Sequence, residues 1–315
     1  KRLSWGAYLP RLRAIVRMAI SLGVEVVGVR RGFTGLMNGE FTSLTARSVG
    51  GIVGRGGTFL GTSPSVEFAG RRGQLEALRN LNEAEIDGLV VIGGDGTMRG
   101  GLQLHDLGFP VVGVPGTIDN DVPGTDSSIG FDTALNTALD AIDRIKDTAT
   151  SLQRAFLVEV MGRKSGYLAL MAGLAGGAEM VCIPEQDFEL DDVARTITDA
   201  YIKGKAHCII VVAEGARYNA AAIADYLRER QDEAGFSVRV TILGHIQRGG
   251  APMAFDRSLA TRLGSAAAEY LIRGDRGVMI GLVGSEIVAT PFAEILARRK
   301  PFDLDMYRLA EVLAH

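Results

Sequence analysis

The sequence has few cysteines, and they lack the spacing of a metal site. Only Cys182 and Cys208 occur among its 315 residues, both in apolar surroundings and without a Cys-x-x-Cys pair. Cysteines of this kind are typical of buried free thiols rather than of a disulfide framework or a zinc site. Free thiols fit a reducing compartment, so we expect the protein in the cytoplasm.

An excess of one charge and long apolar runs are also missing. The chain has 34 lysines and arginines against 37 aspartates and glutamates, and this net charge of −3 offers no basic surface for nucleic acid. No apolar stretch approaches the roughly 20 residues of a membrane-spanning helix, and the first residues lack a signal peptide's hydrophobic region. We therefore expect neither a nucleic-acid nor a membrane partner.

Glycine, by contrast, is plentiful. The chain has 41 glycines and no short-period repeat, which favours many tight turns between strands and helices. Short apolar runs predict buried strands at 24–29, 89–92, 111–114, 155–160, 208–212 and 278–283. Amphipathic segments lie between them, the clearest from Phe131 to Ile145. The alternation predicts an α/β fold of two similar doubly wound domains, with mainly parallel sheets and an active-site cleft between the domains.

Two glycine-containing loops follow two of the predicted strands. Residues 93–97 read Gly-Gly-Asp-Gly-Thr after strand 89–92, and residues 115–121 read Pro-Gly-Thr-Ile-Asp-Asn-Asp after strand 111–114. Neighbouring parallel strands deliver such loops to one crevice. Glycines let the backbone approach a polyphosphate, and carboxylates hold a metal ion or take a proton. The pair of loops therefore predicts a phosphoryl-transfer site.

Both loops also have ordinary interpretations. Asp95 is either a cap in a simple strand-to-helix turn or a ligand of Mg²⁺ beside N–H groups that face phosphates. Thr117, Asp119 and Asp121 alternate, which places their side chains on one face if the segment is extended. Three polar groups on one face at the end of a buried strand are costly unless they are used. The second loop therefore favours the functional interpretation.

Three further groups of polar residues follow predicted strands. Residues 159–163 read Glu-Val-Met-Gly-Arg, and Arg163, with Arg154 before it, suits either a phosphate or a structural ion pair. Glu214 either accepts a hydrogen bond from a sugar hydroxyl or is the acid at a helix N-terminus. His245 and Arg248 precede a glycine pair, which fits an anionic ligand better than it fits a core histidine.

Four strings occur in one order along the chain: Gly-Gly-Asp-Gly-Thr, Pro-Gly-Thr-Ile-Asp-Asn-Asp, Val-Glu-Val-Met-Gly-Arg and Leu-Gly-His-Ile-Gln-Arg-Gly-Gly. With them the chain resembles the 6-phosphofructokinases of bacterial type, from about Arg13 to its last residues. The resemblance implies transfer of the ATP γ-phosphate to the 1-hydroxyl of fructose 6-phosphate, with Mg²⁺, to give fructose 1,6-bisphosphate and ADP in glycolysis. It implies a larger nucleotide-binding domain, 1–129 plus about 247–294, and a smaller sugar-phosphate-binding domain, 130–246 plus about 295–315.

The resemblance also implies roles for single residues. Asp119 is the general base for the 1-hydroxyl, while Thr117 and Arg163 stabilise charge on the moving phosphoryl group. The nucleotide is bound by Gly94, Asp95, Gly96 and Thr97, with Asp95 as the metal ligand. The sugar phosphate is bound by Asp121, Met161, Gly162, Glu214, His245 and Arg248. Arg154 and Arg239 match arginines that reach into a neighbouring subunit, which implies a homotetramer with shared active sites.

Two glycines bear on the phosphoryl donor. Pyrophosphate-dependent relatives carry an aspartate where this chain has Gly96 and a lysine where it has Gly116. The aspartate would obstruct the α-phosphate of a nucleotide, and the lysine would take over charge stabilisation. With glycine at both positions, the resemblance favours ATP as the donor.

The resemblance also implies that the protein is under allosteric control. Family positions that bind nucleotide diphosphate or phosphoenolpyruvate are matched by Arg13, Arg17, Glu179, Lys203 and Lys205. For the two lysines, a solvated basic surface is the alternative. An arginine expected just before Ser48 falls at Ala46 or the shifted Arg47, and an expected aspartate is Gly51. Neither the sign of the control nor its ligand is fixed by the sequence.

The chain departs from the family on its nucleotide side. Family members open with a central strand and a Gly-Gly-Asp-Ala-Pro-Gly-x-Asn phosphate loop, and neither is recognisable in residues 1–10, before a first helix at about 10–22. Pro64 replaces an arginine that contacts ATP, and Arg71 and Arg72 are out of register with it.

Two explanations of these departures stay open. Either the sequence is incomplete or altered at its N-terminus and the parent enzyme is ordinary, or the chain is a catalytically weak subunit kept for regulation or sugar-phosphate binding. The preserved Asp95, Asp119 and Arg163 favour the enzyme. A pyrophosphate-dependent enzyme is a third alternative.

Overall fold

The computed structural model describes residues 2–5, 9–63, 65–230 and 235–314, and the chain forms two compact units. Unit 1 comprises residues 1–117, 121–130 and 250–300. Unit 2 comprises residues 118–120, 131–249 and 301–315. The α/β class and the mainly parallel sheets are confirmed in both units.

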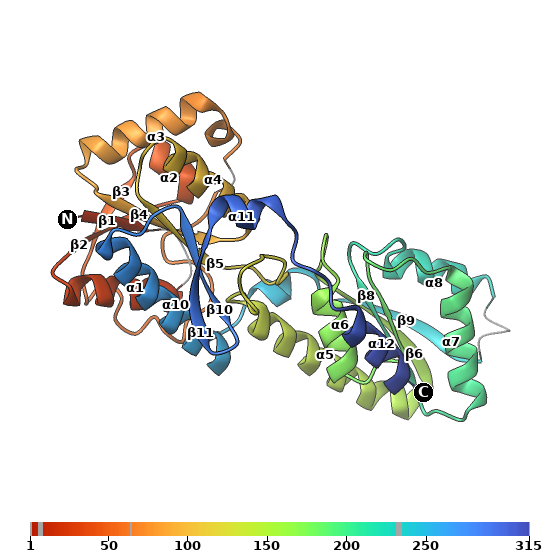
Figure 1. The fold of residues 1–315 in the computed structure, drawn as a ribbon. Helices are drawn as coiled ribbons and strands as arrows, with labels where there is room; N and C mark the ends of the chain where they lie inside the picture. Colours follow the sequence, from red (N-terminus) through yellow and green to blue (C-terminus); the bar gives the residue numbers. More distant parts are fainter. Residues whose placement is uncertain (1, 6–8, 64, 231–234, 315) are drawn as a thin grey trace. The chain divides into compact units, whose positions relative to one another are not determined.

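A 7-stranded sheet forms the centre of unit 1 over the described residues, in the order β11-β10-β5-β4-β1-β2-β3 (Figure 1). The two edge strands, β3 and β11, run antiparallel to their neighbours, and the other pairs are parallel. The strands are β1 Arg2–Trp5, β2 Glu25–Val29, β3 Phe41–Leu44, β4 Gly88–Gly93, β5 Val111–Pro115, β10 Val278–Val283 and β11 Glu286–Pro291.

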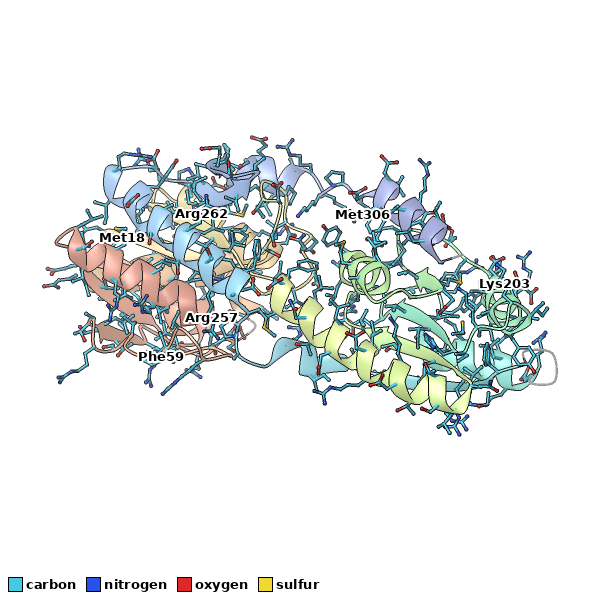
Figure 2. The ribbon with its side chains drawn as sticks, turned by 90° about the horizontal axis from the view of Figure 1, so that it is seen from below. Met18, Phe59, Lys203, Arg257, Arg262 and Met306 are labelled. Atoms are coloured by element: carbon cyan, nitrogen blue, oxygen red, sulfur yellow. The ribbon has the colours of Figure 1, made fainter. Side chains whose placement is uncertain are left out.

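Helices cover both faces of this sheet. The helices of unit 1 are α1 Leu9–Ser21, α2 Gly32–Met37, α3 Arg71–Glu83, α4 Asp95–Asp106, α10 Ala254–Arg273 and α11 Phe292–Ala297, with a 3₁₀ turn η1 at Glu67–Ala69. α1 and α10 pack side by side, and Figure 2 labels Met18 on the first and Arg262 on the second. Gly264 allows this approach, because a Cβ there would lie 3.0 Å from the carbonyl oxygen of Arg11. The other face is covered by α3, α4 and α11.

The strand β1 corrects one sequence-based expectation. It lies between β2 and β4 and is parallel to both, with Ser4 opposite Val27 and Leu89. The sequence Arg-Leu-Ser-Trp is not a continuous apolar run and so gave no strand signal. Main-chain pairing needs no particular side chain, and β1 pairs the backbone groups of β2 and β4 that would otherwise form open edges. Residues 6–8, where a phosphate loop would follow the strand, lie outside the described residues.

Unit 2 contains a 4-stranded parallel sheet over its described residues, in the order β7-β8-β6-β9. Its strands are β6 Arg154–Val160, β7 Met180–Cys182, β8 Cys208–Ala213 and β9 Ser237–Ile242. Its helices are α5 Phe131–Leu152, α6 Tyr167–Ala175, α7 Leu190–Ile202, α8 Ala220–Arg228 and α12 Leu304–Leu313, with a 3₁₀ turn η2 at Gly244–Arg248. One core cluster joins the sheet to α7 and α8, and a second joins it to α5 and α6, so this unit is also doubly wound.

The predicted strands are confirmed as β2, β4, β5, β6, β8 and β10. The helix expected over 131–145 is α5 and extends to Leu152, and the first helix is α1. Among the described residues, none of the helices has the length and apolar character needed to span a membrane.

Candidate active site

In unit 1 the two glycine-containing loops lie side by side. β4 and β5 are parallel neighbours, with Gly93 opposite Pro115, and the N–H of Gly116 donates to the carbonyl of Gly93 over 2.8 Å. A Cβ placed on Gly94 would lie 3.5 Å from the Cβ of Thr117, so the loops touch without crowding. The prediction that both loops reach one edge of the sheet is confirmed.

Asp95 is the first residue of α4, with Gly94 as its N-cap residue. The interpretation of Asp95 as the cap is therefore wrong, because it lies inside the helix. Its side chain is 56% exposed, and its Oδ2 lies 3.5 Å from Nη2 of Arg99 one turn further on. A helix N-terminus carries partial positive charge and favours anions, so this end of α4 presents both backbone dipoles for phosphate and a carboxylate for a cation.

The second loop alternates in burial but not as an extended strand. Ile118 and Asn120 are 8% and 2% exposed, whereas Thr117, Asp119 and Asp121 are half-buried. Asn120 has a φ of 49°, in the left-handed region where asparagine is enriched, so the backbone turns there. The segment is therefore not extended, as the prediction of a common face assumed. It bends at Asn120, but its residues still alternate between half-buried and buried.

The same loop is divided between the two units. Residues 118–120 group with unit 2, where Ile118 belongs to a small core cluster with Phe131, Ala134 and Met161. Thr117 and Asp121 group with unit 1, as does the Gly93–Thr97 loop. The candidate base Asp119 is therefore anchored with the residues predicted to bind the sugar phosphate, all of which except Asp121 lie in unit 2.

Three strand ends of unit 2 carry the remaining predicted site residues. The N–H of Glu214 donates to the carbonyl of Val160 over 2.9 Å, and the N–H of Leu243 donates to that of Glu159 over 2.9 Å. These bonds continue the β6–β8 and β6–β9 ladders into the loops. The structure thus brings together residues 161–163, 214–215 and 243–248 at the carboxyl edge of one sheet.

The polar side chains on these loops face solvent. Arg163, Glu214, His245 and Arg248 are all exposed, whereas Met161 is 4% exposed. His245 and Arg248 are three residues apart in the 3₁₀ turn η2, and this spacing places them on one side of it. Two arginines, an imidazole and an acid at this edge of the sheet suit a ligand that carries both a phosphate and hydroxyl groups.

Gly162 has the backbone that this edge needs. Its φ is 139°, and a Cβ there would lie 2.5 Å from the carbonyl oxygen of Ser165. Only glycine fits both conditions. Glu159, which belongs to the same string, has a structural part: its Oε2 accepts the N–H of Ala220 at the start of α8 over 2.9 Å.

Arg154 and Arg239 lie on one face of the unit 2 sheet. Arg154 is opposite Ser237 and Phe156 is opposite Arg239, so the two arginines are two positions apart on neighbouring strands. Arg239 is exposed on β9, the edge strand, and donates from Nη1 to the carbonyl of Val238 over 2.9 Å.

The predicted effector residues fall into two groups, one in each unit. Arg13 and Arg17 are one turn apart on α1. In unit 2, Nζ of Lys205 lies 3.4 Å from Oε1 of Glu179 and donates to the carbonyl of Ala314 over 2.7 Å, while Oε2 of Glu179 accepts the N–H of Ile209. Lys205 is therefore paired, and the solvated-surface interpretation is wrong for it. Lys203 is exposed at the end of α7 (Figure 2).

Burial shifts the pKa of several groups outside these loops, among them both cysteines and Lys300. Both cysteines are free and buried, and desolvation raises the pKa of Cys182 to about 12 and that of Cys208 further. The thiolates are thus disfavoured, and the expectation of buried free thiols is confirmed. Burial lowers the pKa of Lys300 to about 8, against the opposing charges of Asp126 and Asp121. Its Nζ donates to the carbonyl of Asp126 over 2.8 Å.

Two residues near the loops gave no functional signal in the sequence. Arg11, fully buried on α1, donates from Nη2 to the carbonyl of Ile129, and its Nη1 lies 1.9 Å from where a Cβ on Gly116 would stand. Gln247, 1% exposed, accepts the N–H of Met161. An arginine in a helix and an amide inside a polar string are ordinary surface patterns, so neither residue was predicted to be buried.

The described residues include no cluster of three or more His, Cys, Asp or Glu side chains that could hold a metal by itself. This composition still fits Mg²⁺, which proteins commonly bind through one or two carboxylates together with substrate phosphates and water. The exposed carboxylate of Asp95 is suited to such a shared ion.

Comparison with known proteins agrees with this geometry. The sequence profile of the phosphofructokinase family matches residues 10–271. The chain is 50% identical to an ATP-dependent 6-phosphofructokinase of Halalkalibacterium halodurans over 303 residues, which cover 96% of this chain and 94% of the relative.

Solved structures show the same fold. Phosphofructokinase from Saccharomyces cerevisiae superposes with a TM-score of 0.85 at 35% identity, over 94% of this chain and 45% of the yeast chain, so this chain spans less than half of that protein. A pyrophosphate-dependent phosphofructokinase from Marinobacter aquaeolei gives a TM-score of 0.86 at 20% identity, over 97% of this chain and 86% of that one. At that identity the likeness concerns the fold alone.

Both units are doubly wound, and glycine–carboxylate loops follow the carboxyl ends of their parallel strands. These features are typical of a class of nucleotide- and phosphate-binding α/β proteins. Within it, the sequence match over most of the chain is decisive. The chain belongs to the phosphofructokinase family.

Proposed function

We propose that the protein is an ATP-dependent 6-phosphofructokinase, a kinase of glycolysis. It transfers the γ-phosphoryl group of ATP to the 1-hydroxyl of fructose 6-phosphate and releases fructose 1,6-bisphosphate and ADP. The observation that carries the proposal is the hydrogen bond from the Gly116 N–H to the Gly93 carbonyl, which joins the two predicted phosphoryl-transfer loops. The identity of the substrate and of the donor is taken from the relative of Halalkalibacterium halodurans, which is half identical over nearly the whole chain.

Asp119 acts as the general base. A carboxylate within hydrogen-bond reach of the attacking hydroxyl takes its proton as the bond from that oxygen to phosphorus forms and the bond to the ADP oxygen breaks. Thr117 and Arg163 stabilise the charge on the group in transfer. The grouping of residues 118–120 with unit 2 supports this role, because it keeps the base with the residues that hold the acceptor.

The sugar phosphate is held by the loops of unit 2. Arg163 and Arg248 supply positive charge for its phosphate, His245 donates a hydrogen bond to it, and Glu214 accepts hydrogen bonds from its hydroxyl groups. All four side chains are exposed at one edge of the sheet, which leaves them accessible to the substrate. Met161, Gly162 and Asp121 complete the set, with the glycine allowing close backbone approach.

The nucleotide is held by residues 94–97 of unit 1. Backbone N–H groups at the start of α4 receive phosphate oxygens, and Asp95 holds Mg²⁺ with Asp121 nearby. When bound, the ion offsets the charge of the β- and γ-phosphates.

The two donor glycines differ in the space around them. A Cβ on Gly96 meets no heavy atom within 4 Å among the described residues, so the absence of a side chain there is not required by the fold and leaves room for a nucleotide. A side chain on Gly116 would collide with the Arg11 guanidinium. A lysine of the kind found in pyrophosphate-dependent relatives would therefore require the buried Arg11 guanidinium to move, and this supports ATP as the donor.

A catalytically weak regulatory subunit is the second candidate. Two sequence departures on the nucleotide side favour it: residues 1–10 do not match the family's glycine-rich loop, and position 64 is a proline. The presence of β1 in the centre of the sheet argues against it, because the frame that supports β4 and its loop is intact.

Assembly and regulation follow the family. We place the protein in the cytoplasm as a homotetramer with shared active sites, to which Arg154 and Arg239 contribute across subunits. Their common sheet face, at the exposed edge strand β9, supports that placement. Nucleotide diphosphate or phosphoenolpyruvate effectors would bind through Arg13, Arg17, Glu179, Lys203 and Lys205.

The test is product formation from fructose 6-phosphate and Mg²⁺, with ATP and pyrophosphate supplied in parallel. Turnover with ATP alone is expected, and Asp119→Asn is expected to lower it by roughly 10²- to 10⁴-fold, as loss of a general base should. Asp143→Asn, an exposed carboxylate on α5, is the matched control and should keep full activity. Turnover with neither donor, in a protein that still binds fructose 6-phosphate, would establish the regulatory subunit instead.

A further inference from the structure

Gln247 is the buried member of an otherwise exposed turn. In η2, His245, Ile246 and Arg248 are exposed, and Gln247 alone is 1% exposed. A 3₁₀ turn of five residues has too few internal hydrogen bonds to fix its own position. This side chain therefore adds a buried link between unit 2 and the turn that carries His245 and Arg248, besides the backbone bond from Leu243 to Glu159.

The link that Gln247 makes is one buried hydrogen bond. Oε1 of Gln247 accepts the N–H of Met161 over 2.7 Å, between residues 86 positions apart in the chain. Met161 is the first residue after β6 and is 4% exposed. The direction of the bond is fixed, because a backbone N–H only donates and only the oxygen of the amide accepts.

Met161 leads directly into the other half of the site. The carbonyl of Gly162, the residue after Met161, accepts the N–H of Gly215 over 3.2 Å. The carbonyl of Val160, the residue before Met161, accepts the N–H of Glu214 over 2.9 Å. The loops 161–163 and 214–215 are thus joined by backbone bonds, and Gln247 adds the loop 244–248 to them.

The choice of glutamine at this position is costly to the fold. Nε2 of Gln247 is buried and has no hydrogen-bond partner among the described residues. An unpaired buried donor destabilises a protein, and a leucine of similar size would fill the space without it. Packing alone does not explain the amide, whereas the acceptor for Met161 does.

We propose that Gln247 is a positioning residue for fructose 6-phosphate: its Oε1 sets the distance between the Met161–Arg163 loop and the His245–Arg248 turn. The inference rests on the proposed function and deepens it. Gln247 itself does not touch the substrate in this arrangement, since its side chain is enclosed. It acts through the placement of Arg163 on one side and of His245 and Arg248 on the other.

The test compares two substitutions that differ in one property. Gln247→Leu keeps the volume and removes the acceptor, and we expect the KM for fructose 6-phosphate to rise about 10-fold, with the KM for ATP within about 2-fold of wild type. Gln247→Glu keeps a carbonyl-type oxygen for Met161 whether or not the carboxyl is ionised, so the KM for fructose 6-phosphate should return to within about 3-fold of wild type.

Gln74→Leu is the matched control. Gln74 is also a buried glutamine, 6% exposed, with one side-chain bond to a backbone carbonyl, and it lies in unit 1. It should lose stability without any change in the KM for fructose 6-phosphate. Equal losses in Gln247→Leu and Gln247→Glu, or parallel changes in both KM values, would overturn the positioning role.

Hydrogen exchange separates this inference from the proposed function. The amide of Met161 should exchange faster in Gln247→Leu than in wild type or Gln247→Glu, whether or not the protein turns over any substrate. Unchanged exchange at Met161 would overturn the link itself. If exchange is faster but wild type binds no fructose 6-phosphate, the link stands as structure and the substrate assignment fails.

Discussion

Gly96 offers a test of donor choice that leaves the protein itself undisturbed. Because a Cβ at this position meets open space among the described residues, Gly96→Asp should fold as wild type does. Its carboxylate would then face the α-phosphate of a bound nucleotide, and we expect the KM for ATP to rise by at least about 10-fold. Steady-state kinetics with varied ATP check this, with Gly96→Ala as the control for bulk without charge. Unchanged ATP kinetics in the aspartate variant would remove Gly96 from donor selection.

Lys300 gives the folded protein a specific pH dependence. Burial lowers its pKa to about 8, whereas the unfolded chain keeps the ordinary value of 10.5. Between these values the unfolded state binds more protons than the folded state, so the free energy of unfolding contributed by this group rises with pH. Below about pH 8 both states are protonated, and the charged lysine is a constant cost.

We therefore expect the stability of wild type, relative to Lys300→Met, to increase from pH 8 to pH 10. Denaturant unfolding of both proteins across that range measures the difference. Lys146→Met, which replaces a half-buried lysine on α5 by the same residue, serves as the control. A flat or falling difference would contradict the burial of a charged Lys300.

At the scale of single elements, α8 depends on its N-terminal caps. The side chain of Asn219 accepts the N–H of Ala222 over 2.9 Å, and Glu159 on β6 accepts the N–H of Ala220. Asn219→Ala should lower the free energy of unfolding by about 1 kcal/mol, and Asn219→Ser should restore most of it. Catalytic activity should change little in either variant, since Asn219 lies outside the proposed machinery. An alanine variant as stable as wild type would show that the cap is replaced by solvent.

Which elements could be predicted from the sequence depended on burial. β4, β5 and β8 are buried along their whole length, and a continuous apolar run is a clear signal for such strands. The edge strands β3, β9 and β11 are partly exposed and mix polar with apolar residues, and β7 has only three residues. β1 was not predicted, because its position is determined by main-chain pairing with its two neighbours, β2 and β4.

The site divides in the same way. The loops proposed to face ligand carry glycine and charged residues in recognisable strings, and for this reason Asp95, Asp119 and Arg163 could be predicted from the sequence. Gln247 and Arg11 act through a partner that lies far away in the sequence, at Met161 and Ile129. No local pattern encodes such a pairing, which is why the supporting residues emerge only from the structure.

For the whole molecule, the decisive question is whether subunits share active sites. If Arg154 serves a neighbouring subunit, Arg154→Ala and Asp119→Asn damage different parts of the assembly. Mixed after dissociation and reassembly, the two inactive proteins should form some sites that carry neither change, and activity should return to a measurable fraction of wild type. The control mixes Arg163→Ala with Asp119→Asn, two residues assigned to the same subunit's site, and should show no recovery. Failure of the first mixture to recover, in verified mixed tetramers, would argue against shared sites.

The order of strands in unit 1 has a consequence for synthesis. The sheet of unit 2 draws all its strands from residues 154–242, so it is available to form while the chain is still on the ribosome. β5, by contrast, waits for β10 at residues 278–283 to cover its open edge. During that interval the nascent chain exposes the buried apolar strand that leads into the Thr117–Asp121 loop, and an open strand of this kind is prone to aggregate. The edge of β5, the strand next to the proposed catalytic loop, thus stays open to other strands until residues 278–283 have been made.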